Sequence, residues 1–253
     1  MTATQVSLFQ LDNYGPWTVT PEPRPEPQLQ ALQARLYADL ADAVGSRGGY
    51  VFYTRFDNVV AVTNGIDREA HRRIQEQIGN QYPVTVSAAV ASDASPAAAL
   101  ALASERLQGA GSAQDAAREA ALVGDPLGEA GEAHVAHFDV VDVTGKYTDE
   151  IDAYGAYLRV TEAVQALSAH MYEANDALTF FVGGDNAIAV CPDLSPEAYE
   201  AAIDHVEDET GVELQVGVGH GPTAREAGMD AKHALEACRR EGMRVAGLHV
   251  RAD

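Results

Sequence analysis

A repeat of about half the chain length constrains this sequence more than any other feature. The segment Phe52–Val62 (FYTRFDNVVAV) matches Phe180–Val190 (FFVGGDNAIAV), which lies 128 residues further along. Upstream, Leu8–Asp12 (LFQLD) matches Val135–Asp139 (VAHFD) at an offset of 127 residues. Each of the longer segments has the pattern of two strands joined by a tight turn. The sequence therefore predicts two copies of one structural unit.

The elements around the matched segments follow the same order in both copies. The expected helices and third strands are Leu29–Val44, Asp67–Ile78, Val84–Val90 and Pro96–Leu107 in the first copy, and Ile151–Met171, Pro196–Glu209, Val212–Val218 and Ala224–Arg239 in the second. This order predicts an α+β fold with two tandem ferredoxin-like or palm-type βαββαβ domains, residues 1–126 and 127–253. A last strand over Val245–Val250 has no clear counterpart in the first copy, and Gly109–Glu132 is expected to be a linker.

Length and composition exclude several classes of protein. With 253 residues, 46% of them apolar, the chain can bury a sizeable core. Its apolar runs, such as Val59–Val62, are far shorter than the roughly 20 residues of a membrane span. The first residues lack the pattern of a secretion signal, and two cysteines, Cys191 and Cys238, cannot form a disulfide framework. We expect a cytoplasmic protein without a membrane partner.

The charge of the chain limits its partners. A net charge of -21 offers no basic surface for general binding to nucleic acid. Fifteen arginines against two lysines, on an acidic and alanine-rich chain, favour adaptation to high salt, where self-repulsion is screened. A polyanionic ligand must then be held locally, and metal ions are the natural means.

Four aspartates occupy matching places in the two copies. Asp12 and Asp139 end the first strands, and Asp57 and Asp185 lie in the hairpin turns. Since the first strand and the hairpin are neighbours in this topology, each pair is expected to converge and to share Mg²⁺, which prefers one or two carboxylates with water and phosphate oxygens. Ordinary turn chemistry is the alternative explanation for each aspartate.

Several other residues carry weaker signals. Gly183 and Gly184 would let a nucleotide approach the second hairpin closely. Arg55 could reach a phosphate or form a surface ion pair, and Tyr14 and Trp17 could stack on a purine or anchor their loop. His137 and His220 are candidates for a proton shuttle, with ordinary packing as the alternative. A zinc site and a dinucleotide fingerprint at Gly217–Gly221 are not supported by residue spacing.

The motifs together resemble a known family. They are DNYGPWTVTP (Asp12–Pro21), LQALQARLYAD (Leu29–Asp39), FYTRFDN (Phe52–Asn58), TNGID (Thr63–Asp67), GSAQD (Gly111–Asp115) and FVGGDN (Phe181–Asn186). Over essentially the whole chain they are similar to archaeal GTP cyclohydrolase III. The resemblance implies a duplicated palm-like fold, dependence on Mg²⁺, stimulation by a monovalent cation such as K⁺, and a homo-oligomer, which we expect to be a dimer or tetramer. An aspartate pair is expected to hold two Mg²⁺ ions.

The implied reaction opens the guanine imidazole ring of GTP and releases pyrophosphate. The product is a formylaminopyrimidine ribonucleotide monophosphate used in flavin and deazaflavin synthesis. Carried over by motif, the catalytic and metal-binding residues fall among Asp12, Asp57, Asp139 and Asp185. The implied substrate-binding residues are Asn13, Tyr14, Gly15, Trp17, Arg55, Asn58, Gly183, Gly184 and Asn186.

Three functions and the location of the site stay open at the level of sequence. The two glycines favour the second copy as the working half, the long loop from Asn13 to Pro21 favours the first, and the halves could share one site. A nucleotidyl or diguanylate cyclase is the alternative enzyme, although Asn186 stands where such an enzyme has an acid. A non-catalytic GTP-binding sensor is the third possibility.

Overall fold

The computed structural model describes residues 3–124 and 131–247. The chain divides into two compact units, one of Ala3–Ala94 with Ala98–Gly131, the other of Ser95–Ala97 with the residues from Glu132 onward. The domain boundary expected between residues 126 and 127 lies outside the described residues. None of the helices in the described ranges combines the length and hydropathy that a bilayer span requires.

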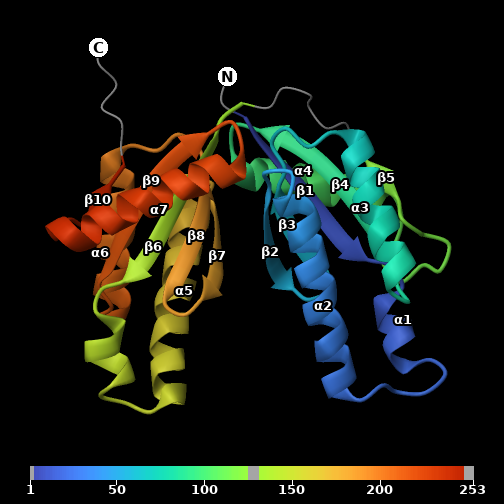
Figure 1. The fold of residues 1–253 in the computed structure, drawn as a ribbon, viewed down its shortest axis with the longest axis horizontal. Helices are drawn as coiled ribbons and strands as arrows, with labels where there is room; N and C mark the ends of the chain where they lie inside the picture. Colours follow the sequence, from blue (N-terminus) through green and yellow to red (C-terminus); the bar gives the residue numbers. More distant parts are fainter. Residues whose placement is uncertain (1–2, 125–130, 248–253) are drawn as a thin grey trace. The chain divides into compact units, whose positions relative to one another are not determined.

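The first unit is a five-stranded sheet with helices on both faces (Figure 1). In chain order its elements are β1 (Thr4–Leu11), α1 (Tyr14–Val19), α2 (Glu26–Gly45), β2 (Tyr50–Arg55), β3 (Asn58–Val62), α3 (Arg68–Gln81), β4 (Val86–Asp93), α4 (Pro96–Gly109) and β5 (Leu122–Val123). The strand order is β2-β3-β1-β4-β5, with β1 antiparallel to both of its neighbours.

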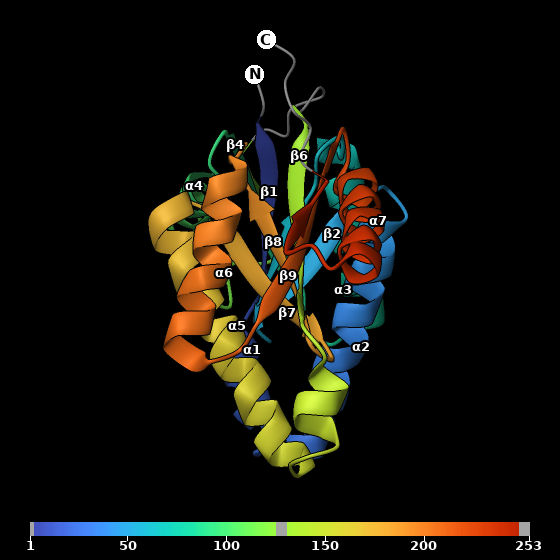
Figure 2. The ribbon, with the colours of Figure 1, turned by 90° about the vertical axis from the view of Figure 1, so that its left-hand side faces the viewer.

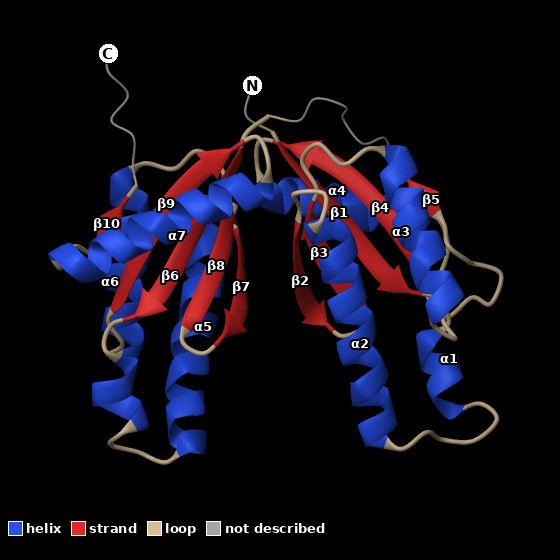
Figure 3. Cartoon of the chain, in the orientation of Figure 1, coloured by secondary structure: helices blue, strands red, loops and turns tan. Residues whose placement is uncertain are grey.

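The second unit repeats this arrangement (Figure 3). Its elements are β6 (Ala133–Val140), the π-helix η1 (Thr144–Thr148), α5 (Ala153–Asn175), β7 (Leu178–Gly183), β8 (Asn186–Cys191), α6 (Pro196–Thr210), β9 (Leu214–Gly221), α7 (Ala224–Glu241) and β10 (Val245–Ala246). The strand order is β10-β9-β6-β8-β7, so β6 takes the place of β1. The predicted fold, two palm-type α+β domains related by duplication, is confirmed.

The first copy does have the last strand that the sequence did not reveal. Strand β5 pairs in parallel with β4, as β10 pairs with β9 in the second unit. Within the expected linker Gly109–Glu132, residues 122–123 form this strand, and residues 125–130 lie outside the described part. Two residues, Leu122 and Val123, are too few to give a periodic signal. The strand predicted over Val245–Val250 is described only as far as Ala246, and residues 248–250 lie outside the described part.

Each sheet buries its main core on one face. In the second unit, α5 and α6 cover this face, where Phe138 and Val140 point, and α7 lies across the other (Figure 2). In the first unit, Phe9 and Leu11 point towards α2 and α3 in the same way. Because side chains alternate along a strand, the residues next to these point to the opposite face. Asp139 is thereby directed to the side of α7.

Helix α7 packs directly on β9 because two glycines face it. A side chain at Gly217 or Gly219 would collide with the backbone of α7 near Ala231. The glycine run that resembled a nucleotide loop is thus a helix-packing surface. It brings the small apolar face of α7, with Ala227 and Ala231, down onto the sheet.

We expect Gly219→Ala to destabilise the second unit, because the added methyl group meets helix backbone that cannot move independently. Overpacking of this kind costs about 1–3 kcal/mol. Gly45→Ala is the matched control, since nothing lies within 4 Å of its added carbon. Thermal unfolding in concentrated KCl, followed by circular dichroism, measures both; equal melting temperatures for the two variants would contradict this packing.

Candidate functional site

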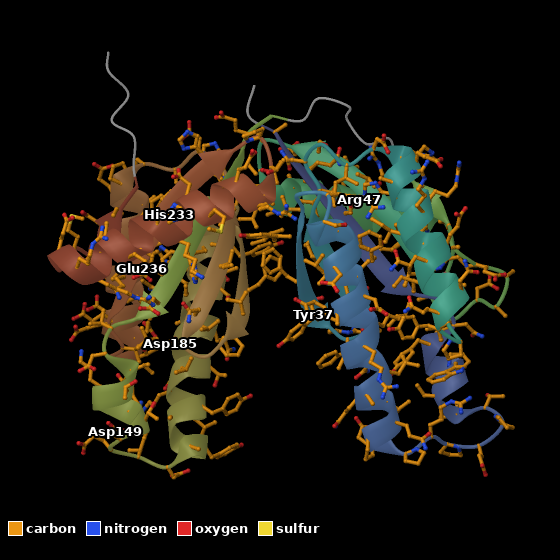
Figure 4. The ribbon with its side chains drawn as sticks, in the orientation of Figure 1. Tyr37, Arg47, Asp149, Asp185, His233 and Glu236 are labelled. Carbon is orange, nitrogen blue, oxygen red and sulfur yellow. The ribbon has the colours of Figure 1, made fainter. Side chains whose placement is uncertain are left out.

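The second unit brings two aspartates together at the end of β6. Asp139 lies opposite Asn186 in the ladder between β6 and β8, and the Val140 amide donates to the carbonyl of Asp185 at 3.3 Å. Burial, and next to it the negative charge of Asp139, raises the pKa of Asp185. The Asp139 carboxylate is therefore close enough to oppose the ionisation of Asp185. Figure 4 shows Asp185 at the hairpin that follows β7.

Asp139 is almost fully buried and is held by two donors on the α7 side of the sheet. The Gln215 amide donates to its Oδ2 at 2.8 Å, and Arg239 of α7 donates to Oδ1 at 2.7 Å and to Oδ2 at 3.3 Å. The Asp139 side chain is 5% exposed and that of Arg239 is 40% exposed. One end of this ion pair is thus fixed in the sheet while the other reaches solvent.

A cavity of about 540 Å³ opens beside both aspartates. Its walls are the end of β6 with the following residues up to Thr144, the start of β9 and the end of α7. Asp142, directly after the strand, has a left-handed backbone with φ of 53°, which turns the chain sharply around the cavity. The volume is in the range of small-molecule sites, about 300–1,000 Å³.

The hairpin between β7 and β8 turns at two glycines and leaves room for a ligand to approach it closely. Gly183 and Gly184 have φ of 109° and 63°, values that side chains disfavour, and nothing would meet a carbon added at Gly183. Asn186 donates from Nδ2 to Asp185 at 2.8 Å and contacts His137 through Oδ1 at 3.0 Å. The hydrogen bond from Asn186 Nδ2 fixes the orientation of the Asp185 carboxylate.

The predicted duplication of the aspartate pair was wrong. Gln10, not Asp12, lies opposite Asn58 in the first unit, whereas Asp139 lies opposite Asn186 in the second. The strand on the other side gives the same correspondence, because Gln10 pairs with Ser87 of β4 as Asp139 pairs with Gln215 of β9. Strands β1 and β6 therefore correspond when Gln10 is aligned with Asp139. This alignment differs by two residues from the sequence match, which aligned Asp12 with Asp139. Gln10 occupies the place of Asp139, and Asp12 lies beyond the end of β1.

Asp12 serves the first unit as a buried structural group. It accepts hydrogen bonds from Thr85 at 2.9 Å, Ser87 at 2.7 Å and the Ala120 amide at 2.9 Å, and forms an ion pair with Arg118 at 3.0 Å. Both members of the pair have side chains 3% exposed. A carboxylate with this many donors ties residues 118–120 to the sheet, which explains why part of the expected linker is folded.

Asp57 lies at its hairpin in a surface ion pair. Arg55 donates to Asp57 at 2.6 Å and 3.1 Å, and Asn58 donates at 3.0 Å. Burial alone would raise the pKa of Asp57, but these donors outweigh it and hold the pKa below its ordinary value. The Arg55 side chain is 75% exposed and pairs with Asp57, which is the surface ion pair that the sequence left open as an alternative.

The loop expected after β1 is in part a short helix, α1, and its residues pack on their own unit. Tyr14 stacks on Trp17, receives a hydrogen bond from Gln33 at 2.8 Å, and Arg24 lies over the indole ring at 4.1 Å. Asn13 has a left-handed backbone, and Gly15 lies against Gln114. These contacts anchor α1, as the anchoring interpretation of the aromatic residues predicts.

The second pair of aspartates fits a magnesium ion by its chemistry. Within residues 3–124 and 131–247 no group of three or more His, Cys, Asp or Glu side chains is placed to hold a metal. Mg²⁺ does not need one, because it combines one or two carboxylates with water and phosphate oxygens. Burial and, after it, the negative charge of Asp139 raise the pKa of Asp185, and a cation beside the two carboxylates would offset both effects.

Two important partners were missed from the sequence. Gln215 and Arg239 hold Asp139, and neither belongs to a motif that drew notice. Arg239 is in the last turn of an amphipathic helix, where basic residues are common for local reasons. A signal for Gln215 existed, because a polar residue in an apolar strand next to the aspartate marks a buried polar contact.

We expect Arg118→Met to destabilise the protein by about 3–5 kcal/mol, since it leaves the Asp12 carboxylate buried without its cation. Arg55→Met removes the cation of the exposed Asp57 pair and should leave the stability unchanged. Urea unfolding of both variants in concentrated KCl makes the comparison. A stable Arg118→Met variant would show that Asp12 is not a structural group.

Comparisons with known proteins show which family the chain is similar to. A family model described as GTP cyclohydrolase III matches residues 6–253. The chain is 57% identical to GTP cyclohydrolase III 1 of Halobacterium salinarum over 243 residues, 94% of this chain and 95% of that protein. It is 56% identical to GTP cyclohydrolase III of Natronomonas pharaonis over 249 residues, 97% of this chain and 98% of the relative.

A more distant relative agrees. GTP cyclohydrolase III of Methanocaldococcus jannaschii is 47% identical over 236 residues, 93% of this chain and 88% of that protein. Among solved structures, the GGDEF domain of DgcB from Caulobacter crescentus covers 46% of this chain and 77% of its own, with a TM-score of 0.39 and 13% identity. On the family match and the three relatives, the chain belongs to the GTP cyclohydrolase III family.

Proposed function

We propose that the chain opens the imidazole ring of GTP and releases pyrophosphate, as its family name indicates, and that the second unit carries the site. The product would be the formylaminopyrimidine ribonucleotide monophosphate of flavin and deazaflavin synthesis. Family membership supports the reaction. The observation that supports the site is the cavity that Asp139 and Asp185 line together, where the charge of Asp139 adds to burial in raising the pKa of Asp185.

Asp139 and Asp185 are the proposed ligands of the Mg²⁺ ions. Bound there, the two ions would supply charge neutralisation for the triphosphate and an activated water. Gln215 and Asn186 keep the two carboxylates in place through hydrogen bonds of 2.8 Å each. The monovalent cation, K⁺ in the family, is proposed without an assigned residue.

Basic side chains of α7 are proposed to bind the phosphates. Arg239 lines the cavity of about 540 Å³ and a neighbouring one of about 290 Å³, and Lys232 lines the smaller cavity. In a chain with net charge -21, these cations on the face above Asp139 are suited to a polyanion. The turn at Gly183 and Gly184 leaves room for the ligand to lie against the hairpin.

His137 is the proposed proton carrier for the step at C8 of guanine. Because the Asn186 Nδ2 donates to Asp185, its Oδ1 faces His137, and the histidine Nε2 must carry the proton. Burial lowers the pKa of His137, so the neutral ring with a free Nδ1 lone pair prevails at neutral pH. His220 lies opposite His134 and is five residues along β9 from Gln215, the partner of Asp139. At strand spacing this separates His220 from Gln215 by roughly 16 Å. It is therefore too distant to share this role.

The cytoplasmic location, the homo-oligomer and the absence of a nucleic-acid partner remain proposals. Each follows from composition or from the family resemblance. The high proportion of acidic residues agrees with relatives that come from the halophilic archaea Halobacterium salinarum and Natronomonas pharaonis. Assays of this chain are therefore designed in concentrated KCl.

We expect purified protein with GTP, Mg²⁺ and KCl to form pyrophosphate and the formylaminopyrimidine product, measured by mass spectrometry. Asp139→Asn and Asp185→Asn should each lower the rate about 100-fold or more, since each removes charge from the metal site. Asp57→Asn, the matched change in the first hairpin, should retain activity. A cyclic or dinucleotide product would identify a cyclase, and unchanged GTP that stays bound would identify a sensor.

We expect His137→Gln to slow ring opening by about 100-fold, because general acid–base catalysis contributes at least that much. The loss of guanine absorbance measures this step, and equilibrium dialysis of GTP shows whether binding persists. His220→Gln is the control and should behave like the unchanged protein. Full activity of His137→Gln would assign the proton transfer to another group.

A further inference from the structure

The first unit has a cavity of about 530 Å³ at the position that corresponds to the smaller cavity beside α7. Strand pairing sets the correspondence, because Asn58 and Asn186 follow equivalent hairpins and lie opposite Gln10 and Asp139. Helices α4 and α7 each begin three residues after the end of the preceding strand. Their residues Leu107 and Leu235 then line the two cavities at matching places.

The two cavities differ in charge. Four ionisable side chains of the second cavity are replaced by uncharged residues in the first: His137 by Leu8, Lys232 by Ser104, Glu236 by Gln108 and Arg239 by Gly111. Asp139 is likewise replaced by Gln10. Among the described residues that line the first cavity, Arg118 alone is charged, and it is paired with the buried Asp12.

The replacements also change the size. Shorter side chains stand where Lys232 and Arg239 reach into the second cavity, and the first cavity is larger, about 530 Å³ against about 290 Å³. A metal-bound triphosphate does not suit it, because there is no carboxylate for the cation and no uncommitted cation for the phosphates. An uncharged ligand of nucleoside size suits both its volume and its walls.

The wall chemistry matches a base and a sugar. Leu8 and Leu107 offer apolar contact to the faces of a ring. Gln10 donates from Nε2 to Asn58 at 2.9 Å, so its Oε1 is presented as a hydrogen-bond acceptor in a fixed orientation. Gln108 and Ser112 add exposed polar groups at the rim, which suits ribose hydroxyls.

We propose that the first-unit cavity binds a purine nucleoside moiety without a metal ion and without turning it over. The duplication has then left one charged cavity for reaction and one neutral cavity for recognition. The choice of a purine rests on the proposed function in one respect, namely that the equivalent cavity of the second unit takes GTP.

Isothermal titration of the full chain with guanosine and adenosine, in concentrated KCl with excess EDTA, tests this proposal. We expect saturable binding of at least one nucleoside. Gln108→Trp, which blocks the rim from an exposed position on α4, should weaken that binding at least 10-fold. Glu236→Trp is the matched change on α7 and should leave it unchanged. Gln10→Leu, which removes the fixed acceptor, should also weaken it.

Three results would overturn the proposal: no nucleoside binding by the unchanged chain, binding that Glu236→Trp removes while Gln108→Trp retains it, or binding that appears only with Mg²⁺. The measurement needs no turnover. Loss of GTP conversion in Asp139→Asn, with nucleoside binding retained, would therefore support both proposals, and their failures are separable.

Discussion

The pairing of β6 with β8 is the constraint on which the site depends. This antiparallel register places Asp139 opposite Asn186 and next to the hairpin residue Asp185. Both aspartates then line one cavity at the strand end, where burial and, after it, the charge of Asp139 raise the pKa of Asp185. A slip by one residue would turn Asp139 into the apolar core. The core between the sheet and helices α5 and α6, with Phe138 on its face, therefore holds the geometry of the proposed site in place.

The same scaffold serves a different purpose in the first unit. Gln10 takes the place that Asp139 has in the second unit. Asp12, two residues further on, forms an ion pair and accepts three hydrogen bonds within its own unit. Asp139 lines one cavity together with Asp185, whereas the described residues that line the cavity beside Asp12 do not include Asp57. Duplication thus preserved the backbone while the two copies divided their chemistry, one charged and one neutral.

The sequence predicted the fold well because duplication shows each element twice. Strand and helix periodicity placed β1 to β4 and their counterparts, whereas β5 was too short to leave a pattern. The candidate site was predicted only in part. Asp139 and Asp185 stay a prediction as metal ligands. The sequence match aligned Asp12 with Asp139, whereas the strand register shows that Gln10 is the structural counterpart of Asp139. Arg118 and Arg239 act over long sequence separations, which periodicity does not report.

The position of the bound metal tests the central claim most directly. A crystal of this chain grown with Mn²⁺ and a non-hydrolysable GTP analogue would locate the ions by anomalous scattering. The geometry predicts peaks beside Asp139 and Asp185, with the triphosphate towards Arg239. A peak against Asp12 or Asp57, with none beside Asp139, would contradict it.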